Sequence, residues 1–194
     1  MDGFERRKQK KQNNILNTAV SLFLQKGIKS VSIAEIANTA SVSQVTIYNY
    51  FGSKDKLLKQ AMIFYVEELF GEYVEILDSD QPFPEKIKQF IFHKAELSEQ
   101  IHEEVYEYLL NDLHGAPSFL EKIYQEKSIP FFHQLIQLGK KDGYINEQIS
   151  EESIMMHIQM YKNFLQQKNI GNKILPYTED IMNLFFYGIM GKEK

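Results

Sequence analysis

The twenty residues from Ser32 to Phe51 constrain this chain more than any other segment. Ser32 and Glu35 have the spacing of a capping box, in which the Ser hydroxyl accepts the Glu amide N–H and the Glu carboxylate reaches back to the Ser amide. The sequence therefore predicts a short helix that starts at about Ile33. Its buried face consists of apolar residues at helical spacing, namely Ile33, Ile36, Ala37 and Ala40.

A second short helix follows after a tight polar turn. Ser41–Ser43 interrupts the first helix, and Ser43 is of the residue type that caps helix N-termini. The second helix is therefore predicted over about Gln44–Tyr50. Ile47 and Phe51 lie four residues apart and are expected to bury on its inner face. The residues left largely outward are Gln44, Val45, Thr46, Asn49 and Tyr50.

These outward residues have the chemistry that a helix in the DNA major groove needs. Gln and Asn side chains bind adenine edges bidentately, and Thr and Val can contact bases through a hydroxyl or methyl group. Ser and Tyr hydroxyls suit phosphates, which set register rather than sequence. A helical hairpin whose polar face meets only water fits the same spacing. The pattern nevertheless favours a helix-turn-helix that enters DNA.

A net charge of −4 does not by itself suggest a DNA-binding protein. The distribution of charge along the chain, however, agrees with DNA binding by the motif. Residues 1–60 hold ten Lys/Arg and four Asp/Glu, a net +6, whereas residues 61–194 hold twelve and twenty-two, a net −10. Binding of basic side chains releases counterions from DNA, which favours association. The motif thus lies in the basic part of the chain, residues 1–60, which a polyanion such as DNA attracts. The run Arg6–Lys11 fits a solvated tail, but beside the motif we favour an arm that lies on phosphates or in the minor groove.

Composition argues against other classes of protein. The chain contains no Cys, which rules out disulfides and thiolate metal sites and fits a reducing cytoplasm. No uncharged apolar run is long enough to cross a bilayer, and no secretory signal core is present. Phosphate-cradling glycine loops, nucleophile-elbow motifs and His pairs at metal-ligand spacing are also missing. We therefore expect a cytoplasmic protein that is not an enzyme and has no cofactor, metal site or membrane partner.

Helical periodicity extends through the rest of the chain. A first helix is predicted over about Arg6–Gln25, closed by Gly27, and a long helix over about Lys54–Leu77. Further helices are expected over about Pro84–His93, Glu96–Leu113, Pro117–Lys141, Glu151–Gln166 and Thr178–Met190. Pro130 should kink or split the helix that contains it. The predicted fold is all-α with about nine helices.

The last two predicted helices each carry two apolar stripes, where a surface helix needs only one. The stripes assigned to the protein's own core are Ile154, Ile158, Tyr161 and Leu165 in one helix, and Ile181, Leu184, Phe185 and Ile189 in the other. The stripes assigned to a partner are Met156, Met160, Phe164, Met182, Phe186 and Met190. We expect a homodimer built on a four-helix bundle, although two central helices of a monomer would give the same pattern.

At this point the chain resembles the TetR family of transcriptional repressors over about residues 9–69. The matching segments are Ile15–Ala19, Leu22-Phe23, Lys26-Gly27, Ser32-Ile33, Glu35–Ala37, Val42-Ser43, Thr46–Tyr48, Tyr50-Phe51, Ser53-Lys54 and Leu57-Leu58. The resemblance implies DNA contacts by Ser32, Ser43, Gln44, Val45, Thr46, Tyr48, Asn49, Tyr50 and Lys54. Ser41 departs from the family, which often has Gly there, and a left-handed backbone at this position would be strained for Ser.

The resemblance also implies a domain division and a mode of action. Residues 9–69 would form a DNA-binding domain with a three-helix head and the motif at 32–51, and residues 70–194 a larger helical ligand-binding and dimerisation domain. The protein would be a homodimeric repressor that a small-molecule effector releases from a palindromic double-stranded operator. Candidate effector contacts are Phe64, Tyr65, Phe90, Tyr106, Phe131 and Tyr161, which ordinary core packing explains equally. A dimeric helical scaffold or an enzyme without operator binding remains the alternative.

Overall fold

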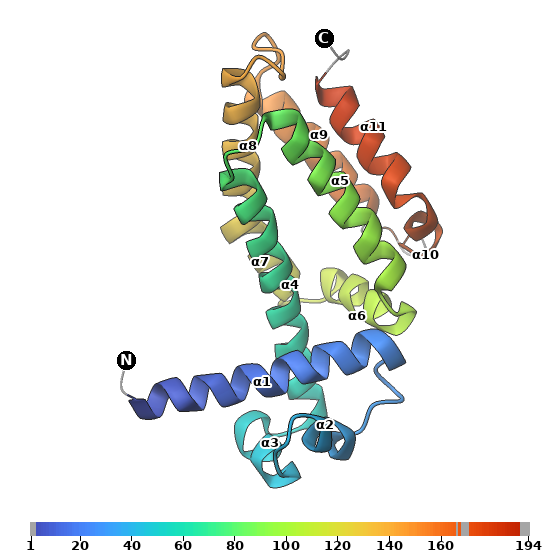
Figure 1. The fold of residues 1–194 in the computed structure, drawn as a ribbon. Helices are drawn as coiled ribbons and strands as arrows, with labels where there is room; N and C mark the ends of the chain where they lie inside the picture. The colour runs from blue at the N-terminus through green and yellow to red at the C-terminus, as the bar shows by residue number, and fades with distance from the viewer. Residues whose placement is uncertain (1–2, 166, 168–170, 191–194) are drawn as a thin grey trace. The chain divides into compact units, whose positions relative to one another are not determined.

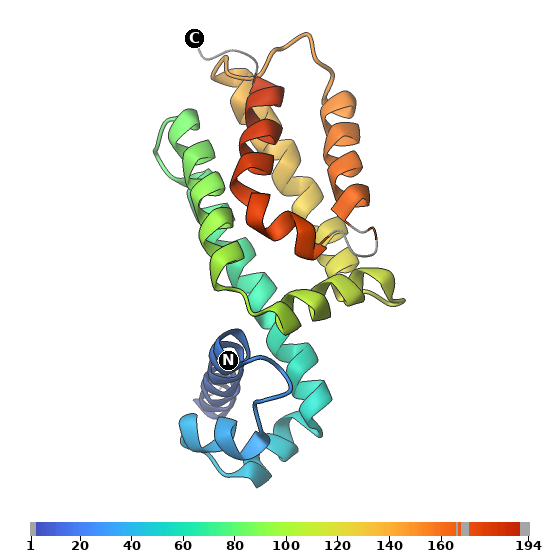
Figure 2. The same cartoon turned by 90° about the vertical axis from the view of Figure 1, so that its right-hand side faces the viewer.

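A computed structural model describes residues 3–165, 167 and 171–190, and this part of the chain is helical without any strand (Figures 1 and 2). Two groups of helical elements follow one another without a break. They are α7 (Phe119–Ile123), the π-turn η1 (Tyr124–Ser128) and α8 (Ile129–Lys141), and then α10 (Gly171–Ile174), η2 (Leu175–Tyr177) and α11 (Thr178–Met190). The described residues thus form nine helical segments, which confirms the all-α prediction.

The chain divides into two compact units. The head unit comprises Met1–Leu69 and Ile101–Leu109, and the body unit comprises Phe70–Gln100 and Leu110–Lys194. The predicted division into functional domains at residue 69 remains a prediction. The head unit also takes in the beginning of α6 (Glu103–His114), whose Val105 is fully buried.

The head unit is built on three helices and the first part of a fourth. They are α1 (Gly3–Lys26), α2 (Ile33–Thr39), α3 (Gln44–Phe51) and α4 (Lys54–Asp78). α1 ends as expected, because Gly27 adopts a φ of +79° and its N–H donates to the Phe23 carbonyl at 2.9 Å. The buried core of the head unit includes Ile15, Ala19, Phe23, Ile36, Ile47, Phe51, Leu57 and Ala61.

The body unit packs one apolar cluster between α5 (Phe83–Gln100), α8, α9 (Glu151–Leu165) and α11. Its buried members include Phe83, Ile87, Phe90, Leu135, Ile136, Ile145, Ile154, Ile158, Phe185 and Phe186. Lys86 enters this unit with only 3% of its surface exposed. Its Nζ donates to the carbonyls of Ile76 and Leu77 at 3.1 and 2.8 Å and also to Ser79, so it caps the end of α4.

Two helix boundaries differ from the predictions. The break expected near residues 94–95 lies instead at Ile101–His102, because α5 continues unbroken to Gln100. No Gly or Pro marks the real break. His102 makes it by accepting the Glu104 backbone N–H on Nδ1 at 3.2 Å, which caps α6 in the manner of an N-cap side chain.

Pro130 is the second residue of α8, and the predicted kink or split coincides with a change from π-helical to α-helical hydrogen bonding. The preceding turn, η1, widens to a π-helical pattern, and the Ile129 N–H donates to the carbonyl of Tyr124 five residues earlier. Pro130 has no N–H to donate and its ring would crowd the carbonyl four residues before it. One wide turn removes both conflicts, and α8 continues beyond it.

The turn between α2 and α3 contains a residue in a conformation that suits glycine. Ser41 has a φ of +56° and occupies the left-handed position of a Schellman motif. Its N–H donates to the Asn38 carbonyl at 3.2 Å, and the Val42 N–H donates to the Ala37 carbonyl at 2.9 Å. The strain expected at Ser41 from the sequence is therefore present.

We predict that Ser41→Gly raises the free energy of unfolding by roughly 1 kcal/mol, because the left-handed backbone costs a residue with a Cβ about that much. For a chain of this size the thermal midpoint should rise by about 2–4 °C. Ser41→Ala is the matched control, since it keeps the Cβ and should give no gain. Equal midpoints for the two variants in calorimetry would contradict strain at this residue.

Candidate nucleic-acid interface

The candidate interface rests on two capped helices in the head unit. The Ser32 hydroxyl accepts the Glu35 N–H at 3.1 Å at the start of α2. The Ser43 hydroxyl accepts the Thr46 N–H at 3.0 Å at the start of α3 and lies 2.8 Å from the Thr46 hydroxyl. Both caps have the geometry that the sequence predicts. They satisfy amides that a helix start leaves without intrahelical partners.

One face of α3 packs on the head core, and the opposite face is exposed to solvent. Ile47 and Phe51 are buried at 1% and 3% exposure, as expected, and they anchor α3 on the head core. Val45 and Tyr48 are exposed at 67% and 48%. An apolar side chain and an aromatic ring left open to water on a small polar helix are typical of a surface that meets a partner.

The other predicted contact residues differ in their exposure. Those exposed to solvent are Ser32, Ser43, Gln44 and Asn49, and those half-buried are Thr46, Tyr50 and Lys54. Tyr48 is exposed, whereas the ring of Tyr50 packs against Phe51 with centroids 6.1 Å apart. The structure thus presents Gln44, Val45, Tyr48 and Asn49 together as the open face of α3.

Lys54 has a structural contact that the sequence did not reveal. Its Nζ donates to the Ile28 carbonyl at 2.9 Å, so it ties the start of α4 to the turn after α1. The Ser53 hydroxyl caps α4 by accepting the Lys56 N–H at 3.2 Å. An ammonium has three N–H donors, so one bond to a carbonyl leaves donors for a phosphate.

Two other lysines of the head unit are neutralised by carboxylates. Lys26 donates to Glu35 at 2.6 Å, and this hydrogen bond is the main reason why the pKa of the Glu35 carboxyl lies below its usual value. Glu104 accepts the Lys29 backbone N–H at 2.9 Å, which is the main cause of its lowered pKa, and its other oxygen lies 3.6 Å from Lys29 Nζ. Basic charge that remains available for DNA must therefore come from other residues.

Glu104 and His102 are residues of the head unit that sequence reasoning missed. At Gly27, a Cβ would lie 2.6 Å from the His102 ring and 2.9 Å from a Glu104 oxygen. The turn after α1 thus lies directly against the start of α6, and only glycine fits there. No sequence pattern signals this contact, because about 75 residues separate its partners along the chain.

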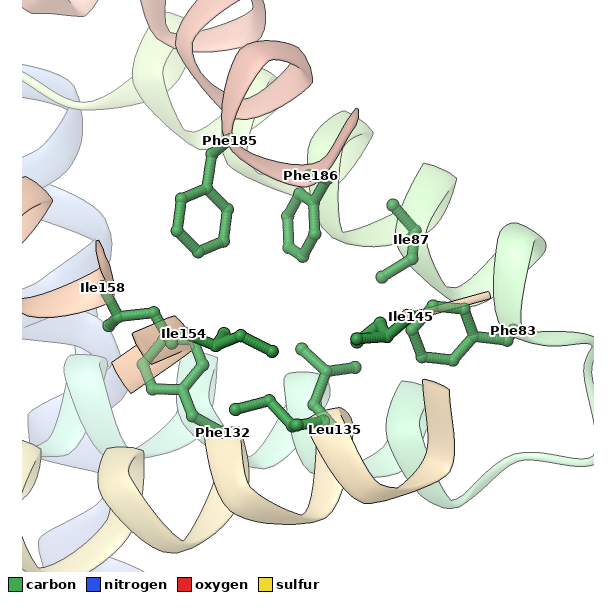
Figure 3. Close-up of a pocket in the computed structure, with 10 residues that line it drawn as sticks. Phe83, Ile87, Phe132, Leu135, Ile145, Ile154, Ile158, Phe185 and Phe186 are labelled. Atoms are coloured by element: carbon green, nitrogen blue, oxygen red, sulfur yellow. The ribbon is translucent and has the colours of Figure 1, made fainter. Parts of the chain in front are cut away.

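The predicted effector residues do not line the apolar cavity between α5, α8, α9 and α11 of the body unit. That cavity measures about 20 Å³, and its walls are Phe83, Ile87, Phe132, Leu135, Ile136, Ile145, Ile154, Ile158, Phe185 and Phe186 (Figure 3). None of Phe64, Tyr65, Phe90, Tyr106, Phe131 and Tyr161 belongs to the wall. Phe90 lies in the core, and Phe131 and Tyr161 pack against it, so these three residues contribute to core packing.

The predicted partner stripe is open on α9 but not on α11. Met156, Met160 and Phe164 are exposed at 68%, 67% and 45%. On α11 the assignment of faces needs correction, because Phe186 is 6% exposed and stacks on Phe90 with centroids 6.3 Å apart. Met182 also packs against the core, and the exposed apolar residues are Leu184 and Tyr187. The side chain of Met190, like those of Leu165 and Ile189, lies outside the described residues.

The reason for this correction is visible in the helix itself. Adjacent residues Phe185 and Phe186 are both buried, with ring centroids 5.0 Å apart at 84°. Phe185 also meets Tyr161 edge-on at 5.1 Å and stacks on His157 at 5.7 Å. Two neighbouring aromatic rings take up the inner face of α11 and turn Leu184 outward, an outcome that helical spacing alone does not distinguish.

Within the described residues, no group of His, Cys, Asp and Glu is arranged to hold a metal ion. No helix in this part of the chain is both long and apolar enough to cross a bilayer. The exposed face of α3 offers hydrogen bonding and apolar contact.

Comparisons with known proteins agree with this geometry. A family model for bacterial regulatory proteins of the tetR family matches residues 15–61. YuxN, an uncharacterised HTH-type transcriptional regulator of Bacillus subtilis, is 28% identical over 174 residues, which cover 89% of this chain and 50% of that protein. The HTH-type transcriptional repressor KstR2 of Mycolicibacterium smegmatis is 24% identical over 136 residues, or 69% of this chain and 66% of that protein. The chain thus spans about half to two thirds of these relatives.

The fold is shared as well. A putative transcriptional regulator from Saccharomonospora viridis, solved in complex with choline, superposes with a TM-score of 0.61 at 19% identity and covers 95% of this chain and 100% of that one. The family model covers both helices of the motif together with the second half of α1 and the start of α4. In its helix-turn-helix, its all-helical fold and these relatives, the chain is similar to the tetR family of bacterial regulatory proteins, whose family model matches the segment that holds the motif.

Proposed function

We propose that the protein is a sequence-specific DNA-binding transcriptional regulator that reads its operator with α3. The observation that carries this proposal is the open face of α3, where Gln44, Val45, Tyr48 and Asn49 stand exposed on a helix whose other side is anchored in the core. Gln and Asn can read adenine edges, Val can meet a thymine methyl, and the Tyr hydroxyl can bind phosphate. The protein would act in the cytoplasm, where the bacterial chromosome lies.

The body unit would hold the effector that releases the protein from DNA. The apolar cavity of about 20 Å³ has room for roughly one water molecule, so an effector would have to part its walls. A ligand that binds only the parted arrangement shifts the population towards it, which is what release requires. Support comes from the names of the relatives, since KstR2 is a repressor and the Saccharomonospora protein was solved with choline.

The regulator would act as a homodimer, with α9 and α11 of each chain forming a four-helix bundle. This proposal is supported by exposed apolar side chains on both helices. They are Met156, Met160 and Phe164 on α9, and Leu184 and Tyr187 on α11. Water contact with so many large apolar side chains is unfavourable, and burial against a second copy removes it. Twofold symmetry would then match a palindromic operator.

A scaffold or an enzyme is a weaker proposal. The named relatives are transcriptional regulators, which favours a protein that performs no reaction of its own. A scaffold would have no use for the head's excess of basic charge, which is +6 over residues 1–60. Operator binding separates the regulator from both alternatives.

We predict that Gln44→Ala combined with Tyr48→Ala weakens binding to the selected operator on the order of 10- to 100-fold, because a bidentate base contact and a phosphate contact are lost. Fluorescence anisotropy with a labelled duplex measures the change. The matched control is Gln137→Ala with Tyr177→Ala, which removes the same side chains from exposed positions in the body unit. Operator affinity unchanged in the head variant would refute α3 as the recognition helix.

We predict that Met156→Glu combined with Met160→Glu converts the dimer to a monomer at micromolar concentration, because each dimer interface would then bury four carboxylates. Sedimentation velocity gives the mass directly. Gln125→Glu with Gln137→Glu adds the same charge at exposed positions outside α9 and should leave the mass unchanged. A wild-type protein that already sediments as a monomer would overturn the proposed dimer.

A further inference from the structure

The sequence suggested that the basic run Arg6–Lys11 is an arm that lies on phosphates or in the minor groove, and the structure places these residues inside α1. The helix starts at Gly3, and its first buried residue is Ile15. Residues 3–11 are all exposed, so the first turns of α1 project beyond the head core, and Figure 1 shows them running past α2 and α3. The basic run is therefore a helical surface of defined geometry.

Four of its cations share one side of α1. We call them the basic ridge, and they are Arg6, Arg7, Lys10 and Lys11. Spacings of three and four residues place side chains on the same helix face. Asn14 continues that face, because it lies three and four residues after Lys11 and Lys10. The buried residues of α1, from Ile15 to Phe23, lie on the other side.

Asn14 connects this face to the DNA-reading motif. Its Nδ2 donates to the Ala40 carbonyl at 2.9 Å, and Ala40 is the C-cap of α2 immediately before the turn into α3. The basic ridge is therefore continuous with the turn that presents α3. From Arg6 to Asn14 this face of α1 is about 12 Å long at the helical rise, which corresponds to about four steps along a DNA duplex.

The cations of the basic ridge are not neutralised by ion pairs with other described residues of the free protein. Among the described residues no carboxylate forms an ion pair with any of its four members, whereas Lys26 and Lys29 of the same unit are both paired. Like charges four residues apart repel each other on a helix. Arg6 and Arg7 also lie close to the positive end of the helix dipole, where cations are unfavourable. A polyanion would relieve all of these repulsions.

We propose that the basic ridge of α1 binds the phosphate backbone of DNA flanking the sequence that α3 reads, and so lengthens each half-site by about four base pairs. This inference rests on the proposed function, because α3 must hold the duplex. The contacts are to phosphates, which carry no base identity. The ridge therefore contributes affinity and salt dependence, and the face of α3 contributes specificity.

The test compares the full-length protein with the variant Arg6→Gln, Arg7→Gln, Lys10→Gln, Lys11→Gln on two duplexes. One duplex ends at the selected operator, and the other extends it by about six base pairs on each side, which is longer than the proposed contact. Wild type should bind the extended duplex on the order of ten times more tightly. The variant should lose this preference, and its salt slope should fall by about 0.9 for each lost phosphate contact.

Two controls isolate the ridge. Lys88→Gln, Lys122→Gln, Lys141→Gln, Lys173→Gln removes the same charge from exposed positions of the body unit and should keep the flank preference. Lys10→Arg with Lys11→Arg keeps the charge and should keep both the preference and the slope. The glutamine variant should also have a thermal midpoint no lower than that of wild type. The four replaced side chains of the basic ridge make no hydrogen bond to other described residues whose loss would weaken the fold.

The outcomes separate the inference from the function beneath it. Wild-type and glutamine-variant proteins with equal flank preference and equal salt slope would show that the ridge is only a solvated surface. The same loss in the body control would attribute the effect to net charge and would also overturn the inference. Wild type that selects no sequence at all would instead overturn the proposed function, and the flanking contact with it.

Discussion

The orientation of α3 depends on one short turn. Ala37, Asn38 and Ala40 end α2 through carbonyls that receive the N–H groups of Val42 and Ser41 and the amide of Asn14. The Ser43 cap then starts α3 one residue later. The turn is short, and hydrogen bonds hold it on both sides. The buried side chains of Ile47 and Phe51 therefore determine which side of α3 remains exposed. A strained Ser41 is tolerated because the hydrogen bonds around it define its conformation.

Sequence reasoning succeeded where local chemistry decides the outcome. Both motif helices, their caps at Ser32 and Ser43, the cap at Gly27 and the left-handed backbone at Ser41 depend on residues within a few positions of one another. It failed where distant packing decides. The contact of Glu104 with the turn after α1 joins segments about 75 residues apart, and the break at His102 is marked by neither Gly nor Pro.

The apolar body illustrates the same limit. Helical spacing identified two stripes on α11, but which stripe is buried depends on the aromatic partners that α5 and α9 supply. Phe90 stacks on Phe186, and His157 and Tyr161 enclose Phe185. The predicted effector residues illustrate a related limit, because aromatic residues that fill a core and those that line a cavity look alike in a sequence.

The central claim is that the open face of α3 reads a specific sequence. Selection of bound duplexes from a random pool, carried out at two salt concentrations, tests it most directly. The account predicts a palindromic sequence that is recovered at both concentrations, since base contacts persist when counterion release is suppressed. Recovery of unrelated sequences whose binding disappears at the higher salt would contradict it, because the head would then recognise phosphate alone.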